Sequence, residues 1–177
     1  VEMGENEKNP PFFFSKPTWT VAKKTVPYPK DTKKLQHEVE LVIAVGEKSK
    51  IFGFCVGVDL TRRDLQKNAK INGKPWFQGK TFQGSSVLSN IILYKKNIDL
   101  THLELELFVN DKLKQSGKCS EMICSPSEII CDLSRDFSLR PGDLIFTGTP
   151  SGVGDLKKGD RITASIPGYI DHNFKII

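Results

Sequence analysis

The sequence predicts an α+β domain that is rich in strands and has few helices. Two apolar runs have the length of buried strands, and a third stretch alternates apolar with polar residues at the two-residue period of a strand. Only two short segments show the three- and four-residue spacing of a helix. The 177 residues suffice for one domain with a substantial core and are too few for two, so we expect a single domain over residues 1–177.

The first predicted strand covers residues 36–45 and begins with two carboxylates. Side chains two apart on a strand share a face, so Glu38 and Glu40 project together, whereas His37 projects to the opposite face. The strand continues into uninterrupted apolar residues, so its far end is expected to be buried on both sides. Buried carboxylates need a partner, and two side by side favour a cation.

The second predicted strand, Ile51–Val58, ends at Asp59, and a helix is expected from Thr61 to about Lys70. Thr61 and Asp64 fit the S/T-x-x-D/E pattern of a helix cap. An aspartate just before a helix is ordinarily a cap itself. A cap supplied by Thr61 would leave Asp59 available for another role.

Glu38, Glu40 and Asp59 would together place three carboxylates at strand positions, with no histidine or cysteine at ligand spacing. All-oxygen ligation selects the hard cations Mg²⁺, Mn²⁺ or Ca²⁺ over Zn²⁺. Spacing alone leaves the alternative open that there is no metal site, because two glutamates on one strand are common.

Three further polar side chains are candidates for such a site. Arg63 and Gln66 are three apart on the predicted helix and share a face, where they either face solvent or hold a substrate carboxylate. Lys80 lies among aromatics in residues 76–82, an expected strand or ordered loop. It is either a surface lysine or a buried functional one.

From residue 103 to residue 115 apolar and polar side chains alternate around a hairpin turn at residues 110–111. One face of this segment is apolar throughout, so Glu104 and Glu106 on the other face are expected to face solvent. The second predicted helix follows Pro126 and ends at about Ser134. Tight turns that lead into strands are expected in two later segments, residues 139–145 and 156–162.

Residues 147–154, Thr-Gly-Thr-Pro-Ser-Gly-Val-Gly, form the least ordinary loop. The loop lacks the G-K-[ST] of a phosphate loop and does not fit G-x-G-x-x-G, so neither nucleotide-binding pattern applies. Its glycines and hydroxyls can nevertheless present backbone N–H groups and a threonine hydroxyl to an anion. A tight structural turn is an equally good interpretation.

Composition limits the partners. The formal net charge is +5, but the lysines are scattered and not interleaved with aromatics, so nucleic acid is not favoured. A small anionic substrate suits such a chain better, although a lysine-rich solvated surface is the simplest interpretation. No apolar run reaches the length of a membrane span. The four cysteines lack metal-ligand spacing and are expected to be reduced and mostly buried, which favours an intracellular compartment.

Taken in order, these segments resemble the fumarylacetoacetate hydrolase family, in its branch of small acylpyruvate hydrolases and oxaloacetate decarboxylases. The resemblance runs nearly end to end, and it is specific because of the order and spacing of its motifs rather than any one of them. The motifs are Glu2-Met3-Gly4, Pro11–Pro17, His37–Leu41, Asp59–Gln66, Trp76–Lys80 and Pro141–Gly154.

The resemblance implies a mixed β-roll of the family's C-terminal-domain type, and a homodimer. It implies that Glu38, Glu40 and Asp59 bind Mg²⁺ or Mn²⁺, with Lys80 beside the metal-bound substrate. It also implies that Arg63, Gln66 and Thr149 lie around the acid groups of the substrate. Lys16 falls on a position near the active site in the family and is a fourth expected substrate-binding residue.

The implied activity is cleavage of a carbon–carbon bond next to a carbonyl in a 2-oxo acid. Acylpyruvate hydrolysis releases an acid and pyruvate, and oxaloacetate decarboxylation releases CO₂ and pyruvate. Keto–enol tautomerisation of oxaloacetate is the alternative within the same family. A bacterial cytoplasm is the expected compartment, with the mitochondrial matrix as the second choice.

Glu2 matches the glutamate of a His-x-x-Glu lid, where the pair orients and deprotonates water. The histidine would precede Glu2 by three residues, outside this chain, and only four residues separate Gly46 from Ile51, where the family has a longer segment. We therefore expect an N-terminal lid segment to be missing from this chain. Without a competent lid, a non-catalytic, metal-dependent 2-oxo acid binder is the competing hypothesis.

Overall fold

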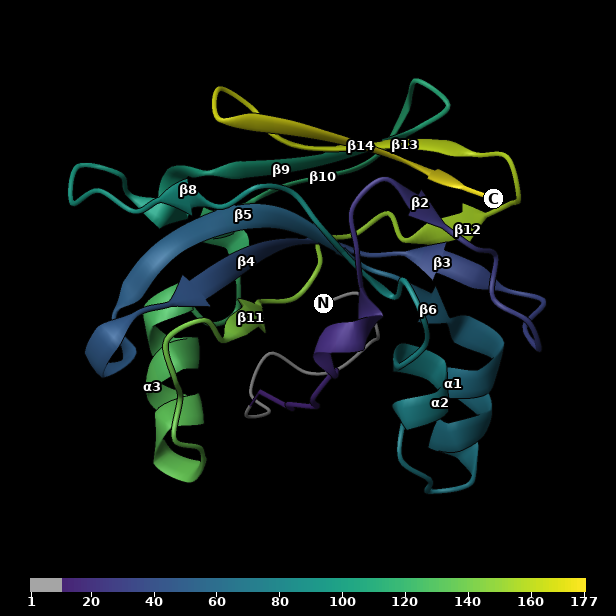
Figure 1. Ribbon diagram of the computed structural model, residues 1–177, viewed down its shortest axis with the longest axis horizontal. Helices are drawn as coiled ribbons and strands as arrows, with labels where there is room; N and C mark the ends of the chain where they lie inside the picture. Colours follow the sequence, from purple (N-terminus) through teal and green to yellow (C-terminus); the bar gives the residue numbers. More distant parts are fainter. Residues whose placement is uncertain (1–10) are drawn as a thin grey trace.

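The computed structural model describes residues 11–177, and the strands of this part form three sheets (Figure 1). The first sheet has the order β1-β7-β5-β4-β11, with β8 attached to β5. Its strands are β1 (Val21–Ala22), β4 (Val39–Val45), β5 (Ile51–Asp59), β7 (Ser86–Leu88), β8 (Ile92–Leu93) and β11 (Leu144–Phe146). The long antiparallel pair β4–β5 forms the middle of this sheet.

The second sheet has the order β10-β9-β13-β14-β2 and covers one face of the first (Figure 1). Its strands are β2 (Thr25–Val26), β9 (Glu104–Val109), β10 (Lys112–Lys118), β13 (Arg161–Ile166) and β14 (Ile170–Ile176). A small third sheet has the order β12-β3-β6. It consists of β3 (Leu35–His37), β6 (Thr61–Arg62) and β12 (Gly154–Leu156).

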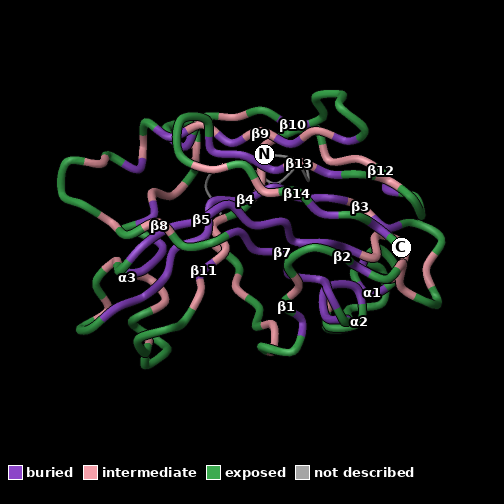
Figure 2. Tube along the Cα trace, turned by 45° about the horizontal axis from the view of Figure 1, so that its top comes forward, coloured by how far each residue is buried: buried purple, intermediate pink, exposed green. Residues whose placement is uncertain are grey.

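The main core lies between the first and second sheets, where the buried segments run through the centre of the molecule (Figure 2). Leu41 of β4, Val56 of β5 and Leu107 of β9 are all fully buried there. Because alternate residues of a strand point to opposite faces, Glu40 lies on the other face of β4. A smaller apolar cluster shares that face, and it consists of Val42, Cys55 and Leu88.

Three α-helices occur in residues 11–177, and they lie on the side of the first sheet away from the second sheet, two of them next to β6 of the third sheet (Figure 1). They are α1 (Arg63–Ile71), α2 (Phe77–Lys80) and α3 (Pro126–Asp136). Short 3₁₀ turns add η1 (Thr18–Thr20), η2 (Glu47–Ser49), η3 (Leu100–His102) and η4 (Cys119–Glu121). No helix in this part of the chain has the length and apolar character to cross a membrane. The strand-rich α+β prediction is confirmed.

The predicted helix after Pro126 is confirmed as α3, which begins with a capping box between Ser125 and Glu128. The predicted turns before β11 and β13 are confirmed as well, with Gly142 and Gly159 both at φ +96°. The four cysteines are free, as expected, but Cys131 is exposed on α3 rather than buried.

The predicted helix cap at Thr61 is wrong. Helix α1 begins at Arg63 without a side-chain cap, because Thr61 belongs to β6 and its hydroxyl donates to the carbonyl of Asp59. Asp64 instead ties the helix to a distant loop, where it accepts a hydrogen bond from the Thr32 hydroxyl at 2.5 Å. Pairing of β6 with β3 therefore overrides the local capping pattern.

Two further boundaries differ from the prediction. Residues 36–45 do not form one strand, because the chain leaves the third sheet at the end of β3 and enters the first sheet at β4, with Glu38 at the junction. Residues 77–80 form helix α2 rather than a strand or loop, and its last residue is Lys80. Both differences place charged side chains at the meeting point of separate elements.

Candidate active site

The carboxylates of Glu38, Glu40 and Asp59 converge on the face of the first sheet that carries the helices. Their oxygens lie within 4.8 Å of one another, and the residues are only 7%, 5% and 3% exposed. The β4–β5 ladder produces this convergence, because Glu40 lies opposite Gly57 and the N–H of Asp59 donates to the carbonyl of Glu38 at 2.8 Å. Backbone pairing thus fixes three buried carboxylates in one place.

The buried ammonium of Lys80, at the end of α2, lies between two of these carboxylates. Its Nζ donates to Glu38 Oε2 at 2.5 Å and to Asp59 Oδ2 at 2.7 Å, and to the Thr61 hydroxyl at 2.7 Å. Burial alone would lower the pKa of Lys80, but the Asp59 and Glu38 charges outweigh it and raise the pKa above its ordinary value. Lys80 is therefore a fixed cation at neutral pH.

Lys16 approaches the same cluster from the N-terminal side. Its Nζ donates to Asp59 and to the carbonyl of Ser85 at 2.8 Å. Burial outweighs the attraction of Asp59 and lowers the pKa of Lys16. For Asp59 itself, burial favours a higher pKa, but Lys16 and Lys80 together hold the pKa below its usual range. Asp59 is accordingly ionised and shared by two lysines.

Arg63 joins the cluster from the first turn of α1. Its guanidinium donates to Glu38, to Gln36 Oε1 at 2.5 Å and to Gln66 Oε1 at 2.5 Å. Arg63 and Gln66 are in direct contact, as the helical spacing predicted, and Gln66 is buried rather than solvent-exposed. The start of α1 therefore presents a guanidinium and an amide next to Glu38.

Glu40 differs from the other two carboxylates, because no lysine or arginine of the described residues forms an ion pair with it. Its Oε2 accepts a hydrogen bond from the Gly148 N–H at 2.6 Å. Burial, followed by the charges of Asp59 and Glu38, raises the pKa of Glu40 to about 8. A positive charge added next to Glu40 would therefore stabilise the ionised form of this carboxyl group.

Thr149 follows Gly148 in the loop 147–154, and its hydroxyl oxygen accepts a hydrogen bond from Gln115 Nε2 at 2.8 Å. The sequence did not identify Gln115 as part of the site. His37 lies on the opposite face from the carboxylates, as predicted, with Nδ1 2.8 Å from Gln115 Oε1. Burial lowers the pKa of His37, so the ring is neutral at neutral pH.

The structure thus gathers the predicted metal and substrate residues around one point, with Thr149 joined through its loop and through Gln115. Glu2, predicted as a lid residue, lies outside the described residues. The backbone N–H of Gly148 contacts Glu40, so this loop amide, expected to face an anion, holds a carboxylate of the protein.

The donor set suits a hard divalent cation. All three converging side chains offer carboxylate oxygens, the ligands that Mg²⁺, Mn²⁺ and Ca²⁺ prefer. The raised pKa of Glu40 supports the same fit, because a buried carboxylate that forms no ion pair with any residue in 11–177 gains most from a nearby cation. Glu38, Glu40 and Asp59 are therefore the residues that would hold such an ion.

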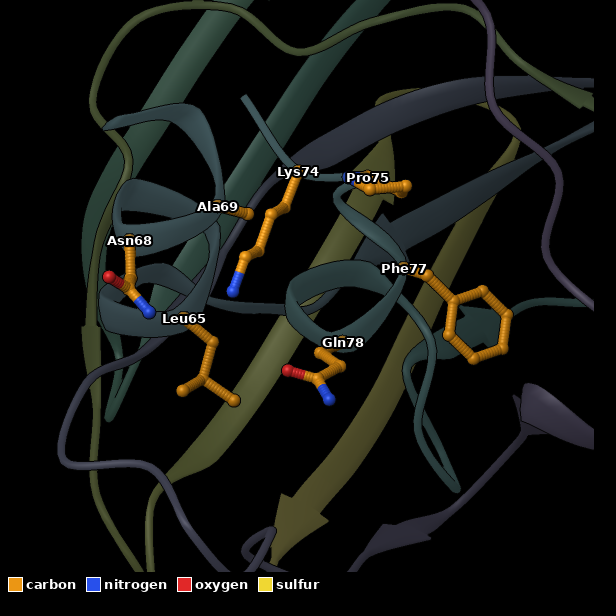
Figure 3. Close-up of a pocket in the computed structure, with 7 residues that line it drawn as sticks. All are labelled: Leu65, Asn68, Ala69, Lys74, Pro75, Phe77 and Gln78. Atoms are coloured by element: carbon orange, nitrogen blue, oxygen red, sulfur yellow. The ribbon is translucent and has the colours of Figure 1, made fainter. Parts of the chain in front are cut away.

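A separate groove of about 350 Å³ lies between α1 and α2 (Figure 3). Its lining contains one cation, Lys74, and no carboxylate, so it shares none of the chemistry of the cluster. The seven lining residues are Leu65, Asn68, Ala69, Lys74, Pro75, Phe77 and Gln78.

The fold and the site together describe a strand-rich α+β domain that carries a buried cluster of three carboxylates, suited to a divalent cation. Residues 1–175 match the family model described as fumarylacetoacetate (FAA) hydrolase C-terminal, so the chain belongs to this family. The predicted fold of the family's C-terminal-domain type and the resemblance are confirmed.

The chain is similar to named members of this family, of which two relatives and one solved structure follow. A fumarylpyruvate hydrolase from Ralstonia sp is 38% identical over 172 residues, which covers 90% of this chain and 89% of the relative. The mitochondrial oxaloacetate tautomerase FAHD1 of Homo sapiens is 35% identical over 187 residues, which covers 99% of this chain and 85% of the relative. The crystal structure of fumarylpyruvate hydrolase from Pseudomonas aeruginosa, in complex with Mn²⁺ and pyruvate, has a TM-score of 0.90 at 34% identity and covers 97% of this chain and 80% of that one.

Proposed function

We propose that this protein is a metal-dependent enzyme that cleaves the carbon–carbon bond next to the carbonyl of a 2-oxo acid. The preferred reaction is hydrolysis of an acylpyruvate to an acid and pyruvate, with oxaloacetate decarboxylation in the same site. The observation that carries the proposal is the buried cluster of Glu38, Glu40 and Asp59, with oxygens within 4.8 Å. A structural neighbour that holds Mn²⁺ and pyruvate supports the substrate class.

The three carboxylates are proposed to hold Mg²⁺ or Mn²⁺, with Ca²⁺ as a third option. A bound ion of this kind would act as a Lewis acid that stabilises negative charge on the 2-keto oxygen. Lys80 supplies a second, permanent positive charge, because its pKa is raised and its ammonium is fixed by Glu38 and Asp59. Lys16 holds Asp59 from the other side, and this limits the ways in which that carboxylate can turn.

The substrate is proposed to bind to four polar side chains around the cluster, three of which are placed at its acid groups. Arg63 and Gln66 contact each other beside Glu38, so a carboxylate placed there would meet a guanidinium and an amide. Thr149, next to the Gly148 N–H that contacts Glu40, offers a hydroxyl. Substrate-binding roles for Lys16, Arg63, Gln66 and Thr149 are part of the proposal.

Acylpyruvate hydrolysis also requires water to attack the distal carbonyl, after which the bond to the departing pyruvate carbon breaks and that carbon is protonated. The family resemblance assigns water activation to a His-Glu lid, and Glu2 keeps this role as a proposal. Decarboxylation of oxaloacetate releases CO₂ and needs no attacking water. The ratio of the two activities therefore measures whether a competent lid is present.

Keto–enol tautomerisation of oxaloacetate is the second candidate function. It is favoured by the 35% identity to the human oxaloacetate tautomerase over 99% of this chain. Tautomerisation needs only proton transfer between carbon and oxygen, so it would also proceed at a charged site without a lid. The tautomerase activity is distinguished by the ultraviolet absorbance of enol oxaloacetate, measured without any release of pyruvate.

The test is pyruvate release from acetylpyruvate, fumarylpyruvate and oxaloacetate, with Mg²⁺ or Mn²⁺ and with EDTA. The proposal predicts metal-dependent release that Lys80→Met reduces strongly. Saturable, metal-dependent binding of pyruvate without turnover of any of the three substrates would instead establish a non-catalytic binder. Turnover that EDTA does not affect would contradict the proposal.

Three properties of the whole protein accompany this proposal. Residues 1–177 are proposed to act as one domain and to assemble as a homodimer, which size-exclusion chromatography with light scattering would show. The proposed compartment is a bacterial cytoplasm, with the mitochondrial matrix as the alternative; the human relative is named as a mitochondrial protein.

A further inference from the structure

The β9–β10 hairpin contains an irregularity next to the candidate site. Leu113 lies opposite Phe108 and Gln115 lies opposite Leu107, so the ladder shifts register at Lys114. A bulge of this kind changes which face the following side chains occupy. Leu113 is 52% exposed, whereas Gln115 is 1% exposed and points into the interior with Leu107. The bulge therefore brings a polar side chain into a buried position.

Gln115 makes every hydrogen bond that its side-chain amide can make. Its Oε1 accepts from the Val39 N–H at 3.1 Å and lies 2.8 Å from His37 Nδ1. Its Nε2 donates to the Thr149 hydroxyl oxygen at 2.8 Å and to the Pro150 carbonyl at 2.9 Å. Val39 N–H can only donate and Pro150 carbonyl can only accept, so these two groups fix the orientation of the amide.

The two ends of this amide reach the two halves of the candidate site. Val39 stands between Glu38 and Glu40 in the chain, so the Oε1 end holds the backbone that carries two of the proposed metal ligands. The Nε2 end holds the loop that carries Thr149. The side chain of Gln115 thus connects the start of β4 to the loop 147–154.

Two glycines show how closely β10 and this loop pack. A Cβ at Gly117 would lie 2.5 Å from Pro150 Cβ, and a Cβ at Gly152 would collide with the carbonyl oxygen of Lys114 in the bulge. Gly152 also has φ +99°, which other residues rarely adopt. The bulge at Lys114 therefore packs directly against the loop 147–154, and the position of the bulge limits where this loop can lie.

The hydrogen bond from Gln115 also determines the direction of the Thr149 hydroxyl. A threonine hydroxyl has one proton to donate and two lone pairs to accept with. Because Gln115 Nε2 occupies a lone pair, the proton of Thr149 is directed away from Gln115 and is available to an acceptor in the site. A substrate carboxylate is such an acceptor, and a hydrogen bond to a charged group is stronger than one between neutral groups.

We propose that Gln115 is a positioning residue, which orients the Thr149 hydroxyl toward the acid group of the substrate and sets its position relative to Glu38 and Glu40. The inference rests on the proposed function, because it takes Thr149 as a substrate-binding residue. Gln115 acts through Thr149 and does not touch the substrate. A residue that served only to fill the interior would affect stability without affecting substrate affinity.

The experiment is a double-mutant cycle between Gln115→Glu and Thr149→Val, with Mn²⁺ present. Glutamate keeps the size and the acceptor of Gln115 and, assayed at a pH where it is ionised, cannot donate to Thr149, and valine keeps the shape of threonine without its hydroxyl. The Michaelis constant for acylpyruvate, the turnover number and the dissociation constant for pyruvate are measured for both single variants and for the double variant. Ser116→Ala, a change at the neighbouring exposed residue, is the matched control.

Each single variant is expected to raise the Michaelis constant and the pyruvate dissociation constant by about 10- to 100-fold, with a much smaller change in turnover number. The double variant is expected to be no worse than Thr149→Val alone, because both changes remove the same hydrogen bond. The proposal would be overturned if the fold-increase of the pyruvate dissociation constant in the double variant equalled the product of the two single fold-increases. Wild-type affinity in Gln115→Glu would overturn it as well. Ser116→Ala is expected to match the wild type.

A second measurement needs no variant and no activity. The amide orientation requires His37 to donate from Nδ1, so ¹⁵N NMR at neutral pH should show a protonated Nδ1 and a bare Nε2. The opposite tautomer would mean that the amide of Gln115 is reversed, and this would overturn the proposal even if the variants failed to fold. Absence of pyruvate binding by the wild-type protein would instead overturn the proposed function, and with it the role given to Gln115. Unchanged affinity in Gln115→Glu overturns the role of Gln115 alone.

Discussion

Two pairs of glutamates in this chain share the spacing Glu-x-Glu at or within a strand and yet have different surroundings. Glu38 and Glu40 are 7% and 5% exposed and lie among cations, a third carboxylate and a loop amide. Glu104 and Glu106 are half-buried on the outer face of β9, where Glu104 accepts a hydrogen bond from the Ser116 hydroxyl at 3.2 Å. The sequence spacing is the same, and the environment is not.

The difference comes from what lies across the strand and above it. Above Glu38 and Glu40 lie Arg63 of α1, Lys80 of α2 and the Gly148 N–H of the loop 147–154, which bond to their carboxylates. Glu106 lies between Ser116 and Ser165 of neighbouring strands and is half-buried. A carboxylate pair becomes a candidate metal site only when other elements bury it and supply opposite charge. Spacing is necessary for such a site and does not suffice.

The largest expected difference between the two pairs is in catalysis. Glu40→Gln should reduce pyruvate release by at least about 100-fold, since even residues that only support metal ligands contribute 10- to 100-fold. Glu106→Gln should stay within twofold of the wild type. Steady-state assays with saturating Mn²⁺ measure both variants. Equal activity of Glu40→Gln and Glu106→Gln would show that the buried pair has no special role.

Removal of the lysine beside each glutamate pair should change the free energy of unfolding by different amounts. Lys80→Met leaves Glu38 and Asp59 buried with less compensation, so the free energy of unfolding should fall by about 3–5 kcal/mol. Lys118, opposite Glu104 in the β9–β10 ladder, is exposed, and Lys118→Met should change stability by less than about 0.5 kcal/mol. Urea denaturation without metal measures both. A loss below about 1 kcal/mol for Lys80→Met would contradict the burial argument.

Stability should depend on pH through Glu40. The pKa of Glu40 rises from 4.5 to about 8 on folding, so between these values the unfolded chain binds fewer protons than the folded one. The metal-free protein should therefore lose stability as pH rises from about 4.5 to about 8, by up to about 1.4 kcal/mol per pH unit. Thermal denaturation across this range should show the slope in the wild type and in Glu106→Gln. A wild-type slope that persists in Glu40→Gln would assign it to another group.

The smallest expected effect concerns the amide that contacts Glu40. Gly148 has φ +98°, and a Cβ at this position would have no atom within 4 Å. Gly148→Ala should therefore lower the free energy of unfolding by about 1–2 kcal/mol through backbone conformation alone. Gly168, in the turn between β13 and β14, has φ +80° and equally open space, so Gly168→Ala should cost a similar amount. Only Gly148→Ala should also reduce activity, by about tenfold, because its N–H holds Glu40. Equal activity of the two variants would show that this hydrogen bond is not used.

Local patterns in the sequence predict a large part of this arrangement. The two-residue period correctly places Glu38 and Glu40 on one face, and the helical period correctly brings Arg63 and Gln66 into contact. Asp59 is correctly placed at the end of the second apolar strand. In each case the deciding geometry spans only a few residues, so the sequence carries it directly.

Features that depend on distant pairing could not be predicted. The break at Glu38 arises because β3 and β4 belong to different sheets, and the Thr61 cap fails because β6 pairs with β3. Gln115 escapes notice because the bulge at Lys114 changes the face of the strand, and no residue type in the sequence marks that shift. Long-range contacts decide all three positions.

The most direct test of the candidate metal site is an Mn²⁺ titration followed by electron paramagnetic resonance at pH 8. The wild type and Glu106→Gln should each bind one Mn²⁺ per chain with the same affinity, and Glu40→Gln should bind at least about 100-fold more weakly. Added pyruvate should alter the Mn²⁺ spectrum only in the first two proteins. Wild-type affinity for Mn²⁺ in Glu40→Gln, or no binding in the wild type, would contradict the assignment of Glu38, Glu40 and Asp59 as the metal-holding residues.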